Sequence, residues 1–121
     1  MKIITAIIKP LMLDAVTDAL IALGVGGMTV LEVKGFGQQR GHVGSYHQTT
    51  TTSSRRHEDP PVQLLSKLRL DVAVKDSMVE KVIEAIVSTA HTGRVGDGKV
   101  FVTDLPRAIR IRNRETGDEA L

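Results

Sequence analysis

The chain has 121 residues, of which 41% are hydrophobic and 25% are charged, and its formal net charge at pH 7 is +2. This length and composition predict one soluble domain with a small core. The absence of cysteine excludes disulfides, thiolate metal sites and cysteine nucleophiles. Because the basic residues are scattered and the aromatic residues are limited to two Phe and one Tyr, we expect no nucleic-acid-binding surface. No apolar run approaches the ~20 residues of a membrane span, so we expect a cytoplasmic protein without signal peptide or membrane insertion.

The first part of the chain predicts a strand, a helix and a second strand. Residues 2–9 are rich in β-branched side chains with few polar ones, which is typical of a strand buried on both faces, and Pro10 ends it. Residues 13–23 place their apolar side chains on one helical face, and Gly24 follows as the glycine that stops the helix. Residues 28–36 then alternate as in a second strand.

The hydrophobic pattern disappears between residues 38 and 61, where polar residues, prolines and threonines dominate. A segment of this length inside a compact domain is usually functional or partly disordered. We interpret it as a protruding loop that docks a protein partner, and a tolerated surface insertion is the alternative.

The same segment holds most of the histidines. Imidazole and carboxylate groups are adequate ligands for Zn²⁺, Ni²⁺ or Cu²⁺, so a metal-sensing alternative would use His42, His47 and His57 with Glu58 or Asp59. Their spacing matches no compact metal motif, and solvated loop histidines are the favoured explanation.

Regular patterning returns in the second part of the chain. Residues 67–74 alternate as a half-buried strand, and residues 79–90 carry an apolar helical stripe. Ser77 and Glu80 have the spacing of a capping box at the start of this helix. Two strand-helix-strand units predict an α+β, ferredoxin-like double βαβ fold, with two helices on one face of an antiparallel sheet. The other sheet face should be partly apolar, through Ala73 and Leu65, and therefore open to burial by another subunit.

A glycine-rich stretch, residues 92–99, leads from this helix into a strand at residues 100–102. Its glycines can adopt positive φ and expose backbone N–H groups to a phosphate, and Lys99 adds a positive charge. Alternation over residues 109–112 would place Arg110 and Arg112 on one strand face beside this turn, which would suit a polyphosphate. A Gly-Asp-Gly hairpin between two strands is the alternative.

Two nearby residues have catalytic and structural interpretations. His91 stands at a helix end, where the helix dipole favours it as a C-terminal cap rather than as a base. Asp97 is the motif's candidate for activating a water, but its flanking glycines indicate a turn role, so we expect no enzyme.

Several phrases of the sequence, in one order, resemble those of the PII signal-transduction proteins. They are residues 7–10, 27–30, 32–37, 41–42, 92–102 and 109–112. The resemblance covers most of the chain except residues 45–61 and implies a single PII-like domain, 1–121, with a long loop at 38–61 and a C-terminal tail at 113–121. It implies a homotrimer that binds ATP or ADP in clefts between subunits and 2-oxoglutarate beside Mg-ATP. The loop would control a protein target such as a membrane transporter, an enzyme or a regulator.

The resemblance also implies roles for individual residues. Those wrapping or pairing with the nucleotide phosphates would be Gly96, Asp97, Gly98, Lys99, Arg110 and Arg112. Those on the adenine and ribose side would be Ile7, Thr29, Gly35 and Asp71, the last standing where the family often has Glu, and Gly37 and Gln38 complete the nucleotide-binding set. Gln39 would coordinate Mg²⁺ and 2-oxoglutarate, and Lys67 would pair with a 2-oxoglutarate carboxylate, with a solvated strand lysine as its alternative. Such a Mg²⁺ site is chemically sensible, because the ion prefers oxygen ligands.

The sequence also departs from the family pattern. Gln38 replaces a common Arg or Lys that reaches the phosphates of the neighbouring subunit, which would weaken discrimination between ATP and ADP. Tyr46 is present, but residues 49–54 replace a more distal tyrosine that many members have uridylylated, and His47 replaces an arginine that plugs ammonium channels. These departures weaken the case for uridylylation and for ammonium-channel control. They leave open a sensor with a different effector, a metal ion or adenylates alone, that regulates a non-ammonium transporter.

Overall fold

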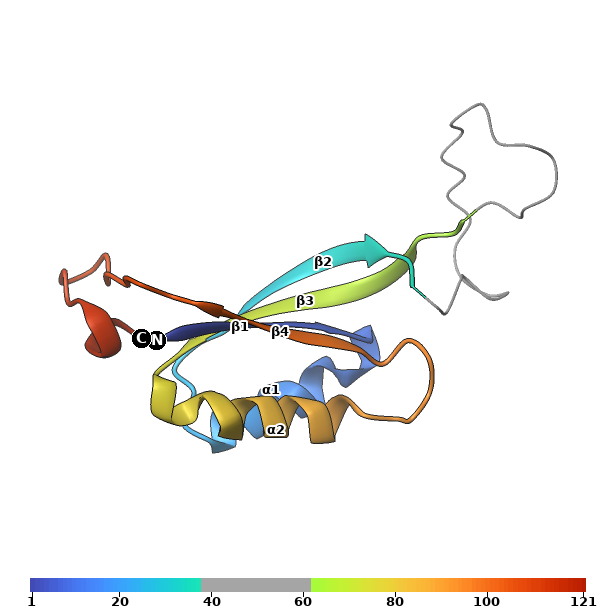
Figure 1. Ribbon diagram of the computed structural model, residues 1–121, viewed down its shortest axis with the longest axis horizontal. Helices are drawn as coiled ribbons and strands as arrows, with labels where there is room; N and C mark the ends of the chain where they lie inside the picture. Colours follow the sequence, from blue (N-terminus) through green and yellow to red (C-terminus); the bar gives the residue numbers. More distant parts are fainter. Residues whose placement is uncertain (38–61) are drawn as a thin grey trace, which may run out of the picture.

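The computed structural model describes residues 1–37 and 62–121 and confirms the predicted order of elements (Figure 1). The predicted protruding loop, residues 38–61, lies outside the described residues. The strands are β1 (Lys2–Ile8), β2 (Thr29–Gly35), β3 (Leu65–Val74) and β4 (Gly98–Asp104), and the helices are α1 (Leu13–Ala22) and α2 (Val79–Ala90). Short 3-10 turns are η1 (Pro10–Met12), η2 (Asp76–Met78) and η3 (Gly117–Ala120).

The strands form one antiparallel sheet in the order β2-β3-β1-β4. β1 is therefore an interior strand, in which Ile4 faces Val72 of β3 on one side and Val102 of β4 on the other. Both helices lie against the same face of the sheet (Figure 1). This arrangement is the predicted α+β, ferredoxin-like double βαβ fold.

The core fills the space between the sheet and the helices. Ile4, Ala6 and Ile8 of β1 are buried there, whereas the residues between them are partly exposed. The prediction that residues 2–9 are buried on both faces is thus wrong for the single chain, because the helices cover only one face. The largest fully buried side chains are Ile4, Ile8, Val16, Leu70, Val72, Val82 and Ile86.

The opposite sheet face is apolar in part, as predicted. Successive strand residues alternate between the two faces, and the register places Leu31 of β2 and Phe101 of β4 on the face without helices. Their side chains are 44% and 52% exposed. Ala73 is partly exposed on this face, but Leu65 is already buried within the chain. This surface is larger than two scattered residues would suggest and is suited to contact with another subunit.

The two helices end and begin in different ways. Gly24 adopts φ +81° after α1, and its N–H donates to the carbonyl of Ile21 at 2.9 Å, which confirms its predicted role in stopping the helix. The predicted capping box of Ser77 and Glu80 is wrong. Ser77 lies within η2, and the N-cap position of α2 is Met78, which makes no side-chain cap hydrogen bond.

Candidate functional site

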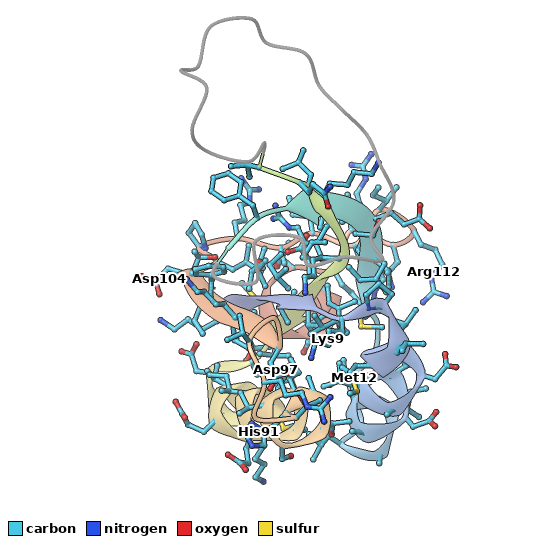
Figure 2. The ribbon with its side chains drawn as sticks, turned by 90° about the vertical axis from the view of Figure 1, so that its right-hand side faces the viewer. Lys9, Met12, His91, Asp97, Asp104 and Arg112 are labelled. Atoms are coloured by element: carbon cyan, nitrogen blue, oxygen red, sulfur yellow. The ribbon has the colours of Figure 1, made fainter. Side chains whose placement is uncertain are left out.

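The glycine loop (residues 92–97) connects α2 to β4 and is organised by the side chain of Asp97 (Figure 2). Its carboxylate accepts hydrogen bonds from the backbone N–H groups of Thr92 at 2.7 Å and Gly93 at 2.9 Å, and also from the Thr92 hydroxyl. Lys9, which follows β1, donates to the same carboxylate at 3.0 Å. The Thr92 hydroxyl above all, then the other donors, holds the pKa of Asp97 far below its usual range. Asp97 therefore has the structural turn role that its neighbouring glycines indicated.

The turn does not join two strands, so the hairpin alternative is wrong. Gly98 begins β4 with φ +106°, and a Cβ atom built on it would lie 1.7 Å from the carbonyl oxygen of Ile7. The backbone of β4 thus approaches β1 more closely than any side chain allows. Gly96 also has a positive φ, of 100°, so both glycines flanking Asp97 are needed for their conformation.

Three lysines surround the glycine loop. Lys67 of β3 donates to the carbonyl oxygen of Gly96 at 2.7 Å. Burial lowers the pKa of Lys67, and the nearby charge of Lys9 lowers it further. Lys99 faces Ile7 across the β1-β4 pair, on the sheet face that the helices leave uncovered. The structure therefore brings together Ile7, Lys67 and residues 96–99 from the predicted site.

His91 occupies the C-cap position of α2, as predicted, and its N–H donates to the carbonyl of Val87 at 3.0 Å. Its Nδ1 atom lies 3.8 Å from an Asp97 carboxylate oxygen. Beside it, a hollow of about 440 Å³ opens between α2, β1 and β4. The hollow is lined mainly by apolar side chains such as Ile86 and Val100, with Lys99 at its edge.

The residues predicted for the adenine and ribose side lie along β2 and β3. Thr29 faces Asp71 across this strand pair, while Gly35 faces Leu65 at its far end. Asp71 already has partners: the Thr5 hydroxyl donates to it at 2.6 Å, and Arg69 Nε donates at 3.1 Å. Gly37 follows β2 in a bend. Gln38 and Gln39 lie outside the described residues, so the proposed Mg²⁺ ligand stays a prediction.

The arginines of the predicted phosphate site belong to a C-terminal hook (residues 108–121) and not to a strand. β4 ends at Asp104, and the chain folds back so that Ile109 forms a bridge with Thr116. The backbone N–H of Arg110 donates to the carbonyl of Glu115 at 2.8 Å, and that of Arg114 donates to the carbonyl of Arg110 at 2.8 Å. The predicted strand over residues 109–112 is therefore wrong, because this backbone bonds with residues a few positions further along.

The hook and the glycine loop lie at opposite ends of β4 (Figure 1). The strand between them has seven residues, which corresponds to roughly 20 Å. Within one chain, Arg110 and Arg112 consequently do not converge on Lys99, and the expectation that they lie beside the glycine turn is wrong at that level.

Two residues important to this geometry were not assigned a role from the sequence. Lys9 was visible only as part of the motif ending in Pro10, and Glu115 lies in a polar tail without periodicity. In residues 1–37 and 62–121, no group of three or more His, Cys, Asp or Glu side chains could hold a metal, and no helix is long and apolar enough to cross a bilayer. The metal-sensing alternative, with its three loop histidines, lies outside the described residues.

Comparisons with known proteins agree with one another. A family model described as Nitrogen regulatory protein P-II matches residues 1–115. Nitrogen regulatory proteins P-II from Rhizobium etli and Azospirillum brasilense are 46% and 47% identical to the chain over 121 residues. Nitrogen regulatory protein GlnK from Escherichia coli is 44% identical over 121 residues. Each alignment covers 100% of both proteins.

Proposed function

The chain belongs to the P-II family of nitrogen regulatory proteins, and from this premise we propose that it is a signal-transduction regulator that senses adenine nucleotides. It binds ATP or ADP in clefts between subunits and controls a protein partner, a membrane transporter or a regulatory enzyme, through residues 38–61. Its regulatory effect comes from binding and not from catalysis.

The observation that carries nucleotide binding is the prearranged glycine loop. Asp97 is the acid closest to the turn, and its charge is directed to Lys9 and to backbone N–H groups of the loop itself. A phosphate approaching Gly96 and Gly98 therefore meets open backbone on glycines, with the ammonium of Lys99 beside it. Backbone N–H groups in such turns, together with a lysine point charge, are a recurring phosphate-binding arrangement.

The placement of the arginines supports a site between subunits. One chain holds Lys99 at one end of β4 and Arg110 and Arg112 beyond the other end. A cleft using all three cations therefore needs two copies of the chain. The uncovered sheet face with Leu31 and Phe101 offers an apolar surface for that contact, and we propose a homotrimer. Light scattering should give three times the 13.1 kDa chain mass, and a stable monomer at micromolar concentration would refute the shared cleft.

Calorimetric titration with ATP and ADP, with and without Mg²⁺, tests the nucleotide site directly. Changing Lys99→Met should weaken both nucleotides roughly ten- to a hundredfold, as expected for losing a charge-assisted contact. Lys81→Met is the matched control, because Lys81 is exposed on α2 and its replacement changes the net charge equally. If both variants bind like the unaltered protein, Lys99 is not a nucleotide ligand.

The effector arm of the proposal concerns Lys67 and Gln39. We propose that 2-oxoglutarate binds only with Mg-ATP present, because the metal joins phosphate and oxoacid. Linkage then requires 2-oxoglutarate to tighten Mg-ATP by the same factor and to leave ADP nearly unchanged. Lys67 would turn part of its donor capacity from the carbonyl of Gly96 to the oxoacid, so Lys67→Met should abolish the coupling with little loss of ATP affinity. An identical response of variant and parent would point to adenylates alone or to another effector.

A further inference from the structure

The guanidinium of Arg110 is already bound within its own chain. Its Nη1 donates to the Glu115 carboxylate, while its Nη2 donates to the carbonyl oxygens of Glu119 at 2.7 Å and Leu121 at 3.3 Å. Arginine's rigid fork suits this arrangement, because its two terminal nitrogens reach different partners at fixed geometry. Arg110 thus ties the two arms of the C-terminal hook and the chain end together.

The backbone of the hook places the other arginine very differently. The base of the hook is closed by the Ile109-Thr116 bridge and by the N–H of Gly117, which donates to the carbonyl of Ala108 at 3.1 Å. Residues 111–113 form the turn at its tip, where Ile111 is 97% exposed. Figure 2 shows Arg112 projecting outward from the molecule. The base cation is directed inward and the tip cation outward.

We propose that Arg110 and Glu115 are positioning residues of the nucleotide site, and that Arg112 is the hook cation that meets the phosphates of a nucleoside diphosphate or triphosphate bound to the adjacent copy. This inference rests on the proposed nucleotide-binding function and divides the work between two arginines that the sequence pattern treats alike. Charge-assisted hydrogen bonds are roughly twice as strong as neutral ones, so withdrawing Arg110 from Glu115 would cost the phosphate contact much of its gain.

The opposite role for Glu115 is a competitor that occupies Arg110 until a phosphate displaces it. The two roles predict opposite signs. Removing the charge of a competitor would free Arg110 and tighten nucleotide binding. Removing the charge of a positioning residue loosens the hook and weakens binding.

The experiment measures ADP affinity by calorimetry on the assembled protein. Glu115→Gln should weaken ADP by roughly tenfold, the effect of about one charge-assisted hydrogen bond. Glu119→Gln is the matched control: Glu119 contributes only its backbone carbonyl to Arg110 in these contacts, so the same charge change should leave affinity unchanged. Arg110→Lys keeps the charge but loses the fork, and it should behave like Arg110→Ala.

A double-mutant cycle tests whether Glu115 acts through the tip. Arg112→Ala alone should weaken ADP at least as much as Glu115→Gln, and the double variant should fall no further than Arg112→Ala. Light scattering on every variant monitors assembly.

Several results would overturn the inference: unchanged or tighter binding by Glu115→Gln, full rescue by Arg110→Lys, a double variant in which the two losses multiply, or a loss of affinity that accompanies a loss of assembly. Failure of the unaltered protein to bind ADP would instead refute the proposed function, and the inference with it.

Discussion

The glycine loop and the C-terminal hook lie at opposite ends of β4, and each is organised by one charged side chain. In the loop, the anion Asp97 accepts from backbone N–H groups and from Lys9. In the hook, the cation Arg110 donates to a carboxylate and to backbone carbonyls. Each turn is thus held by the charge that matches its own backbone dipoles.

The difference between the two regions lies in what remains for a ligand. An anionic ligand at the loop meets lysines, because the internal partner there is an acid. At the hook the internal partner is itself a cation, so the fold consumes a charge that a phosphate could have used. A charged residue in a motif therefore reveals its chemistry, but its neighbours decide whether that charge is used by the fold or offered to a ligand.

The largest expected effect would break the loop side of this comparison. Gly98→Ala should destabilise the protein by more than about 3 kcal/mol, because strain at positive φ adds to a backbone clash. The new Cβ would lie 1.7 Å from the carbonyl oxygen of Ile7, so β1 and β4 would have to separate. Urea denaturation measures the change. Gly27→Ala is the control, since a Cβ there meets nothing within 4 Å; equal effects of the two substitutions would contradict the close approach.

A smaller effect would sharpen the role of Asp97. Because the pKa of Asp97 is depressed in the folded protein, its stabilisation is present above its usual value of 3.8 and is lost as the pH falls below that. The urea midpoint of the unaltered protein should therefore fall more steeply between about pH 5 and pH 2 than that of Asp97→Asn. Asp76 and Asp104, whose pKa values are also lowered, remain in both proteins.

The control for this pH experiment is Asp18→Asn, which changes an exposed acid on α1. It should retain the full slope of the unaltered protein. Parallel curves for the parent and Asp97→Asn would show that the loop does not depend on the ionised carboxylate.

The smallest effect concerns the hook. Arg114 adopts φ 62°, the one positive φ of a non-glycine residue in the described part of the chain. Left-handed backbone costs an L-residue about 1–2 kcal/mol, while glycine costs about 0.5–1 kcal/mol in backbone entropy. Arg114→Gly should therefore stabilise the hook by up to about 1 kcal/mol, seen as slower hydrogen exchange at the Gly117 amide. Arg107→Gly, which lacks this gain, should stabilise nothing; faster exchange in Arg114→Gly would refute the argument.

The fold was predictable because burial leaves a periodic trace. The alternation of residues 67–74 and the helical stripe of residues 79–90 both report which side chains face the core, and β3 and α2 follow them closely. The clustering of Ile7, Lys67 and residues 96–99 was also correctly anticipated. The family resemblance supplied that grouping, and the sheet register produces it.

The hook was not predictable in the same way. Alternating Ile and Arg over residues 109–112 fits a strand, but it fits equally the exposed arm of a tight turn, since neither isoleucine there is buried. Ser77 failed for a similar reason: a capping-box spacing does not reveal that a 3-10 turn precedes the helix. Partner choices such as Arg110 with Glu115 depend on where the backbone returns, and no periodicity records that.

The strand order has a consequence for how the nascent chain folds. β1 leaves the ribosome first, yet both of its neighbours, β3 and β4, come from the second part of the chain, and Ile7 meets Lys99 only when nearly everything has been made. Such non-local pairing is slow, and apolar strands that wait for partners are exposed to aggregation. We therefore expect truncated chains that end before Gly98 to be insoluble or bound by chaperones, because their innermost strand has one edge that only the last strand can close.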